Sequence, residues 1–198
     1  MGGAGMASLS CRLVAVLSAA VIVLPWLVIA FSWSLNPWFD PLRGAFSDLG
    51  SPRAHLPWVF NLGMIVSGLL VMLLGLTVYR VSVLRLEAAG AALLSEAGVF
   101  LALVGMFPEG TKPHSFVAAW FFLQLYTSYV VLGMALYRRG LEKRGRALAL
   151  IGVLAPLLAV LVEYTMGWPS IAVLETYAVL AADAGAAVLA AAYRCTVV

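Results

Sequence analysis

The sequence predicts an all-α protein, a single domain over residues 1–198 folded as a bundle of six transmembrane helices. The chain is 64% hydrophobic and 11% charged, whereas about a quarter of an ordinary soluble domain is charged. Apolar residues in such excess cannot all be buried in a water-soluble core of this size. Windows of roughly 20 apolar residues, the length at which a helix crosses hydrocarbon, recur at about 13–33, 58–79, 88–107, 115–137, 147–166 and 172–193.

The distribution of basic residues gives these helices a direction. Short cytoplasmic loops of membrane proteins collect Lys and Arg, and nine of the 12 basic residues fall on one side if the N-terminus is inside. We therefore expect both termini in the cytoplasm (N-in/C-in) and a multi-pass protein of the cell membrane. The basic segment 137–146 is then an inner anchor that contacts membrane lipids, and it requires no nucleic-acid partner.

The first window and the loop after it carry separate signals. The apolar run from Leu13 to Phe31 is longer than the core of a secretory signal, which predicts a permanent helix. A long outer loop follows at 34–57, with turn signals at 36–37 and 40–41. Within this loop the apolar spacing of residues 38–46 predicts a short helix that lies on the membrane surface.

Small residues mark the faces on which the remaining windows pack. The second window has Gly68 and Gly75, and the sixth is rich in alanine. The third carries small residues at alternating steps of four and three, namely Ala91, Ser95, Gly98, Ala102 and Gly105. Helix interfaces in lipid favour such stripes because they let backbones approach closely. The fourth and fifth windows follow short connections, which favour antiparallel neighbours.

Acidic residues inside or next to the windows are the strongest sign of a site. A charge at mid-depth costs about 2.5–3.5 kcal/mol on the lenient insertion scale, so such residues should not face lipid. We expect a polar cavity that opens outward, with the following rim: Asp48, His55, Glu109, His114, Glu163 and Glu175. Glu96 and Asp183 fall deeper and at similar depths, so we expect them to approach one another as its floor.

The alternative interpretation needs no cavity. The rim acids would pair with Arg43, Arg53 and Lys112, and the deep acids would be hydrogen-bonded between helices. No cofactor is predicted. A metal ion held by His55 and His114 is the sharpest chemical option, but neither histidine shows a ligand spacing such as H-x-x-x-H. Both would otherwise be ordinary residues of interfacial loops.

Two motifs resemble those of a known family. "FSDLGSP" followed by "WVFNLG", and later "GMFPEGTKPH", are similar to the F-S-x-L-G, F-N-x-G and F-P…H segments of domain of unknown function 998, an uncharacterised prokaryotic, archaeal-type family of six-helix membrane proteins. The resemblance covers nearly the whole chain and marks the following motif residues besides His114: Ser47, Leu49, Gly50, Asn61, Gly63, Phe107 and Pro108. The first loop is more distantly similar to the Frag1/DRAM/Sfk1 membrane proteins, which implies a link to lipids, although Phe46 replaces the usual Ile of their motif.

These observations favour a protein that binds or processes a small amphiphile, with a lipid headgroup as the expected polar part, in an outward-opening cavity. They do not decide whether the protein is an enzyme. Two non-enzymatic alternatives stay open. A proton- or ion-coupled transporter should show helices broken at mid-depth. An accessory subunit of a larger membrane complex should have a partner-binding stripe and no cavity, and a homo-oligomer is compatible with all three.

Overall fold

The computed structural model describes residues 2–194, with side chains from residue 12 onward, and these residues form helices and no β-strand. The elements are α1 (Gly2–Ser34), the short 3₁₀ helix η1 (Phe46–Gly50), α2 (Pro57–Val81), α3 (Arg85–Met106), α4 (His114–Arg138), α5 (Glu142–Thr165) and α6 (Ile171–Ala192). All six long helices contain a stretch that is long and apolar enough to cross a membrane. The predicted six-helix bundle is therefore confirmed.

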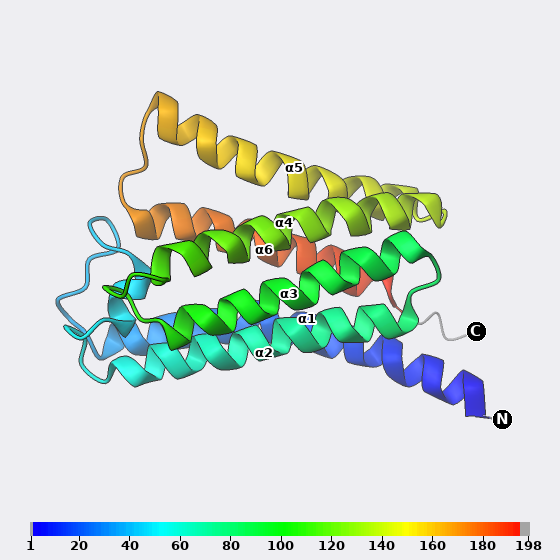
Figure 1. Ribbon diagram of the computed structural model, residues 1–198, viewed down its shortest axis with the longest axis horizontal. Helices are drawn as coiled ribbons and strands as arrows, with labels where there is room; N and C mark the ends of the chain where they lie inside the picture. Colours follow the sequence, from blue (N-terminus) through cyan, green and yellow to red (C-terminus); the bar gives the residue numbers. More distant parts are fainter. Residues whose placement is uncertain (1, 195–198) are drawn as a thin grey trace.

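The bundle has two distinct ends (Figure 1). We call the end that carries the connections 35–56, 107–113 and 166–170 the loop end, and the opposite end, where α1 begins and α6 finishes, the termini end. Which end faces the cytoplasm stays a prediction from the basic residues.

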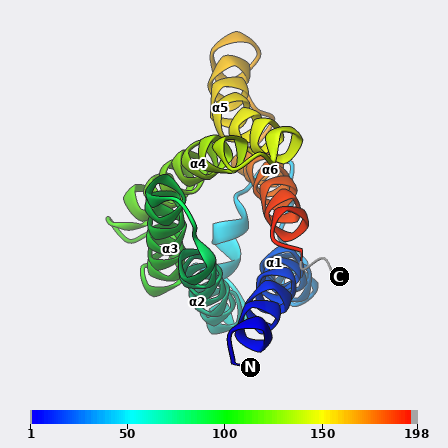
Figure 2. The ribbon, with the colours of Figure 1, turned by 90° about the vertical axis from the view of Figure 1, so that its right-hand side faces the viewer.

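Five of the helices surround a central space. Viewed along the bundle, α1, α2, α3, α4 and α6 form a ring, while α5 lies outside it against α4 and α6 (Figure 2). Toward the loop end α5 diverges from α6 (Figure 1). The short helix η1 contacts α1, α2 and α6 and lies across the loop end of the ring. The ring and η1 together enclose the candidate site.

Glycines bring α2 and α3 into backbone contact, as the small-residue stripes predict. A Cβ added to Gly68 would meet the backbone of Gly98 and Ala102, and one added to Gly75 would meet Ser95 and the carbonyl of Ala91. The absence of side chains at these positions lets the helices approach closely and gain dispersion contacts that lipid could not supply equally well.

The long loop folds inward, so the predicted surface helix over 38–46 is wrong. The helical segment is η1, at 46–50, and Phe39, Phe46 and Leu49 are buried. Phe39 packs edge-on against Trp33, and Phe46 packs edge-on against Trp26. Phe39 and Phe46 therefore pack against the helix bundle, whereas Trp38 and Leu42 of the same segment stay exposed.

An ion pair with a fully buried carboxylate joins three helices at the termini end. Glu87, fully buried on the first turn of α3, accepts hydrogen bonds from Arg139 Nη1 after α4 (2.8 Å) and from the Tyr193 hydroxyl after α6 (2.5 Å). Its other oxygen accepts the Val83 N–H at 2.9 Å. Burial, reinforced by Glu87, raises the pKa of the Tyr193 hydroxyl, so this group stays a hydrogen-bond donor.

Candidate functional site

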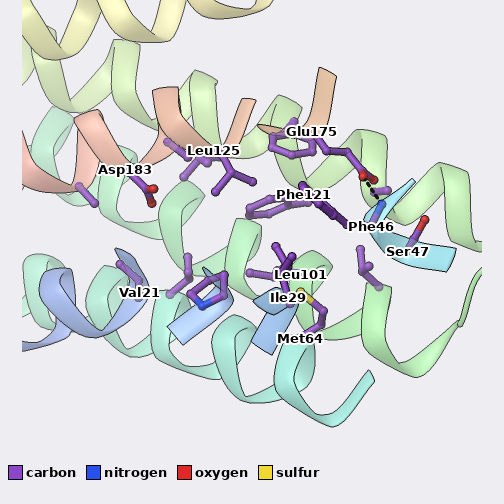
Figure 3. Close-up of a pocket in the computed structure, with 18 of the residues that line it drawn as sticks. Val21, Ile29, Phe46, Ser47, Met64, Leu101, Phe121, Leu125, Glu175 and Asp183 are labelled. Carbon is purple, nitrogen blue, oxygen red and sulfur yellow. Dashed lines mark hydrogen bonds between the residues drawn. The ribbon is translucent and has the colours of Figure 1, made fainter. Parts of the chain in front are cut away.

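A cavity of about 130 Å³ lies inside the ring of helices (Figure 3). Its wall is mainly apolar, with side chains from all five helices of the ring: Val21 and Ile29 on α1, Met64 on α2, Leu101 on α3, Phe121 and Leu125 on α4, and Val179 on α6. Engineered apolar cavities of about 150 Å³ bind molecules of the size of benzene. The space is therefore large enough for a short apolar group.

The polar side chains of the cavity are unevenly placed. Ser47 of η1, His114 at the start of α4 and Glu175 near the start of α6 lie at the loop end. Asp183 is eight residues after Glu175 on α6, which corresponds to about 12 Å along a helix. Tyr129 also lines the wall, but its hydroxyl donates to the Ala182 carbonyl at 2.7 Å. The cavity thus has one polar end and an apolar body with a single carboxylate in it.

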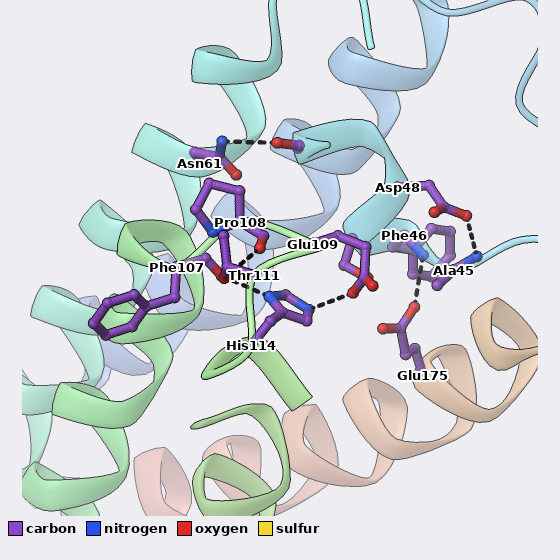
Figure 4. Close-up of polar contacts among 12 residues, drawn as sticks. Ala45, Phe46, Asp48, Asn61, Phe107, Pro108, Glu109, Thr111, His114 and Glu175 are labelled. Atoms are coloured by element: carbon purple, nitrogen blue, oxygen red, sulfur yellow. Dashed lines mark hydrogen bonds and ion pairs between the residues drawn. The ribbon is translucent and has the colours of Figure 1, made fainter. Parts of the chain in front are cut away.

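The loop end of the cavity is formed by η1, and three side chains hold η1 in place (Figure 4). Glu175 of α6 accepts the Phe46 N–H at 2.7 Å. Asp48 accepts the Ala45 N–H at 2.9 Å and so caps the start of η1. The amide of Asn61 on α2 donates to the Gly50 carbonyl at 2.9 Å.

Gly50 is required at this contact for steric reasons. A Cβ at this position would overlap the Asn61 side chain and approach the Phe60 ring to 2.8 Å. The loop can therefore dock on α2 only where residue 50 has no side chain.

A hydrogen bond joins His114 to Glu109 at this end of the cavity. His114 Nδ1 is 2.7 Å from the Phe107 carbonyl, which can only accept, so Nδ1 carries a hydrogen. His114 Nε2 is 3.0 Å from Glu109 Oε2, and this contact also needs a hydrogen between two atoms that could both accept. Ser47 Oγ adds a longer contact to the same oxygen, at 3.3 Å.

The deeper carboxylate links α6 to α1. Asp183 Oδ2 accepts the indole N–H of Trp26 at 2.8 Å. On the other side of α6, the Tyr126 hydroxyl donates to the Ala178 carbonyl at 2.8 Å. Side-chain hydrogen bonds thus connect α6 to both of its neighbours in the ring.

The structure brings together five of the eight acids and histidines proposed from the sequence. Asp48, Glu109, His114 and Glu175 surround the loop end of the cavity, and Asp183 lies farther along its wall. The His55 side chain is exposed on the loop surface, where its backbone N–H and carbonyl bond the Asn36 amide. Glu163 is also exposed, near the loop end of α5, which contributes nothing to the cavity wall.

The expected pairing of Glu96 with Asp183 is wrong. Glu96 is exposed, whereas Leu94 and Leu101 of the same helix line the cavity. Two residues correspond to about 200° around a helix, so Glu96 projects away from the wall that Leu94 forms. Glu96 lies on the outer face of α3, whereas Asp183 lines the cavity on the opposite side of this helix.

The motif residues around the site support its shape. Leu49 is fully buried beneath the loop, and a Cβ on Gly63 would meet Val28, so α2 can lie close to α1. The carbonyl of Phe107 orients the His114 ring, and the carbonyl of Pro108 accepts the Thr111 N–H and hydroxyl at the turn before α4.

The described side chains contain no group of three or more His, Cys, Asp or Glu residues that could hold a metal ion. Both ring nitrogens of His114 are committed to protein oxygens, and His55 lies outside the cavity. The two histidines therefore do not converge on a common metal site in the described structure.

Sequence reasoning missed Trp26 and Tyr129, which connect α6 to its neighbours α1 and α4, and the cluster around Glu87. A weak signal existed for the first two, since Trp and Tyr need a hydrogen-bond partner when buried and Trp26 falls inside an apolar window rather than at its end. Glu87 and Arg139 are 52 residues apart, so only the fold brings them into contact.

Six helices long and apolar enough to cross a membrane, five of them around an internal cavity, define a multi-pass integral membrane protein. The model of a family described as a protein of unknown function, DUF998, matches residues 18–192, and the chain belongs to this family. The motif resemblance is thereby confirmed. No curated protein and no solved structure matches the chain.

Proposed function

We propose that the protein binds a small amphiphile, with its apolar part inside the ring of helices and its polar part at the loop end. The observation that carries this proposal is the shape of the cavity, which has an apolar body and a polar end formed by Ser47, His114 and Glu175. Burial of apolar area favours the tail by about 25 cal/mol per Å². The polar end avoids the cost of burying the head without hydrogen bonds.

The structure gives less support to the two alternatives, a transporter and an accessory subunit. The six long helices run without a break through the described residues, whereas transporters commonly use discontinuous helices at the binding site. An accessory subunit would need no internal cavity. We place the loop end outside the cell membrane, following the basic residues, so that the ligand would come from the outer leaflet or the exterior.

A neutral probe tests this proposal. Radiolabelled octanol would be measured by equilibrium dialysis against the protein in lipid nanodiscs, with empty nanodiscs as the partition blank. Val179→Trp, on the cavity wall, should abolish the excess binding because the indole fills the space. Leu180→Trp, one residue away on the same helix and exposed, should leave it unchanged.

A second variant guards against misfolding of the first. Ala118→Met fills the cavity from α4 and should also remove binding. Equal binding by both cavity variants and by Leu180→Trp, or no excess binding by the unaltered protein, would overturn the proposal.

A further inference from the structure

The hydrogen-bond donors that face the cavity are already committed to protein acceptors. Both nitrogens of His114 contact oxygens, at 2.7 and 3.0 Å, and the Tyr129 hydroxyl donates to the Ala182 carbonyl. The Ser47 hydroxyl donates to Glu109 Oε2 at 3.3 Å. A ligand that only accepts hydrogen bonds therefore finds no free donor at the polar end.

The acceptors have capacity left. Glu175 uses Oε2 for the Phe46 N–H, and Asp183 uses Oδ2 for Trp26. The second oxygen of each carboxylate has no partner among the described residues, although a carboxylate has about four acceptor positions. Both residues line the cavity, so the site can accept several more hydrogen bonds from a ligand.

The charges around the cavity also favour a ligand that donates hydrogen bonds. Among the side chains that the structure describes, no Lys or Arg lines the cavity, and both ring nitrogens of His114 are bonded, to the Phe107 carbonyl and to Glu109. Glu175 and Asp183 are thus left without a cation. An anionic head such as a phosphate would be placed beside two carboxylates in a low dielectric, which is unfavourable.

Aromatic rings complete the polar end. Phe46 and Phe121 line the same cavity as Glu175, and Phe46 also supplies the N–H that orients this carboxylate. Ring faces attract cations, and most strongly in desolvated sites. A carboxylate and aromatic rings at one end of an apolar cavity suit a ligand with a positively charged head and an alkyl tail.

We propose that the polar group of the amphiphile is an ammonium cation, bound by Glu175 at the loop end of the cavity. The inference rests on the proposed function and adds the chemical class of the head. The ammonium donates to the free oxygen of Glu175, and the alkyl chain lies along Ile29, Met64 and Leu125. Asp183, about 12 Å deeper, can accept a second donor from a ligand that carries one.

Three probes with the same alkyl chain test the head group. Octylammonium, octanol and octanoate would each be titrated at pH 7 into the protein in nanodiscs of a zwitterionic lipid, by the dialysis assay used for octanol, with empty nanodiscs as the blank. We expect octylammonium to bind at least about tenfold more tightly than octanol, a factor that corresponds to about 1.4 kcal/mol. Octanoate should bind more weakly than octanol.

Glu175→Gln identifies the residue responsible. The amide oxygen of Gln can still accept the Phe46 N–H, so η1 keeps its anchor, while the charge is lost. Octylammonium affinity should fall about tenfold or more, whereas uncharged octanol should lose less, so the preference for octylammonium disappears. Glu163→Gln, which removes an exposed acid outside the cavity, is the matched control and should alter neither.

The outcomes separate the two proposals. If none of the three probes binds above the blank, the proposed function fails. If octanol binds but octylammonium binds no more tightly, or if octanoate binds most tightly, amphiphile binding stands and the ammonium inference is wrong. The inference is also wrong if Glu175→Gln weakens octanol as much as octylammonium, because Glu175 would then act only on the shape of the site.

Discussion

Replacement of Arg139 should destabilise the bundle strongly, because it leaves a buried charge without its partner. Glu87 has no exposed surface, and Arg139 Nη1 is 2.8 Å from its carboxylate. Removing one partner of a buried ion pair costs about 3–5 kcal/mol. The Tyr193 hydroxyl and the Val83 N–H still bond Glu87, and the Arg139 side chain is one-third exposed, so we expect Arg139→Ala to cost about 3 kcal/mol at most.

Arg146→Ala is the matched control. Arg146 is 3.8 Å from Glu142, and both side chains are largely exposed, so its removal should cost about 0–1 kcal/mol. The free energy of unfolding would be measured in mixed micelles of increasing SDS fraction, followed by tryptophan fluorescence.

The double replacement Glu87→Leu with Arg139→Ala should recover part of the loss, because no charge is then buried. Equal stabilities of Arg139→Ala and Arg146→Ala would refute the reasoning and show that Glu87 can be hydrated or neutralised in place.

Three further predictions address orientation and packing. In a chain whose native cysteines are replaced by serine, Thr111→Cys should react with an impermeant thiol reagent in intact cells and Lys143→Cys should not; the reverse pattern would invert the topology. Gly98→Leu should destabilise the α2–α3 contact by about 1–3 kcal/mol through overpacking, measured by SDS unfolding against the exposed Val99→Leu. Trp26→Phe removes the hydrogen bond between α1 and α6 and should cost about 0.6 kcal/mol and at most about 1.7, the range for interhelical bonds in lipid; a larger loss would mean that the indole has a packing role.

The helices could be predicted from the sequence because the relevant energies are local. A window of apolar residues favours the membrane on its own, and each of the six windows overlaps a helix of the structure. The stripes of small residues were readable too, since the helical period places Gly68 and Gly75 on one face of α2 and Gly98 within a stripe of α3. Only the structure shows that these two faces meet each other.

Helix rotation was not fully predictable. Counting residues predicts similar depths for Glu96 and Asp183, but depth does not say which face of a helix meets the cavity. The small residues of α3 face α2, and its larger Leu94 and Leu101 form the cavity wall. Neither pattern gives the direction of the Glu96 side chain, which is exposed.

The candidate site was predicted in part, for a related reason. The acids and His114 near the loop end come together because their helices end at the same level, which the sequence shows. The inward fold of η1 depends on partners distant in sequence, such as Glu175, which bonds Phe46 from 129 residues away. The aromatic spacing of this loop could equally have served a membrane surface, and only the arrangement of the helices decides between the two.

Photolabelling tests the central claim, a cavity that holds an amphiphile, most directly. A short-chain alcohol that carries a diazirine would be activated with the protein in nanodiscs, and the modified residues would be mapped by peptide mass spectrometry. The structure predicts labels on Phe121 and Leu125, inside the ring, which disappear in Val179→Trp and persist in Leu180→Trp. Labels confined to lipid-facing residues such as Val99 and Leu157, and unchanged by Val179→Trp, would contradict it.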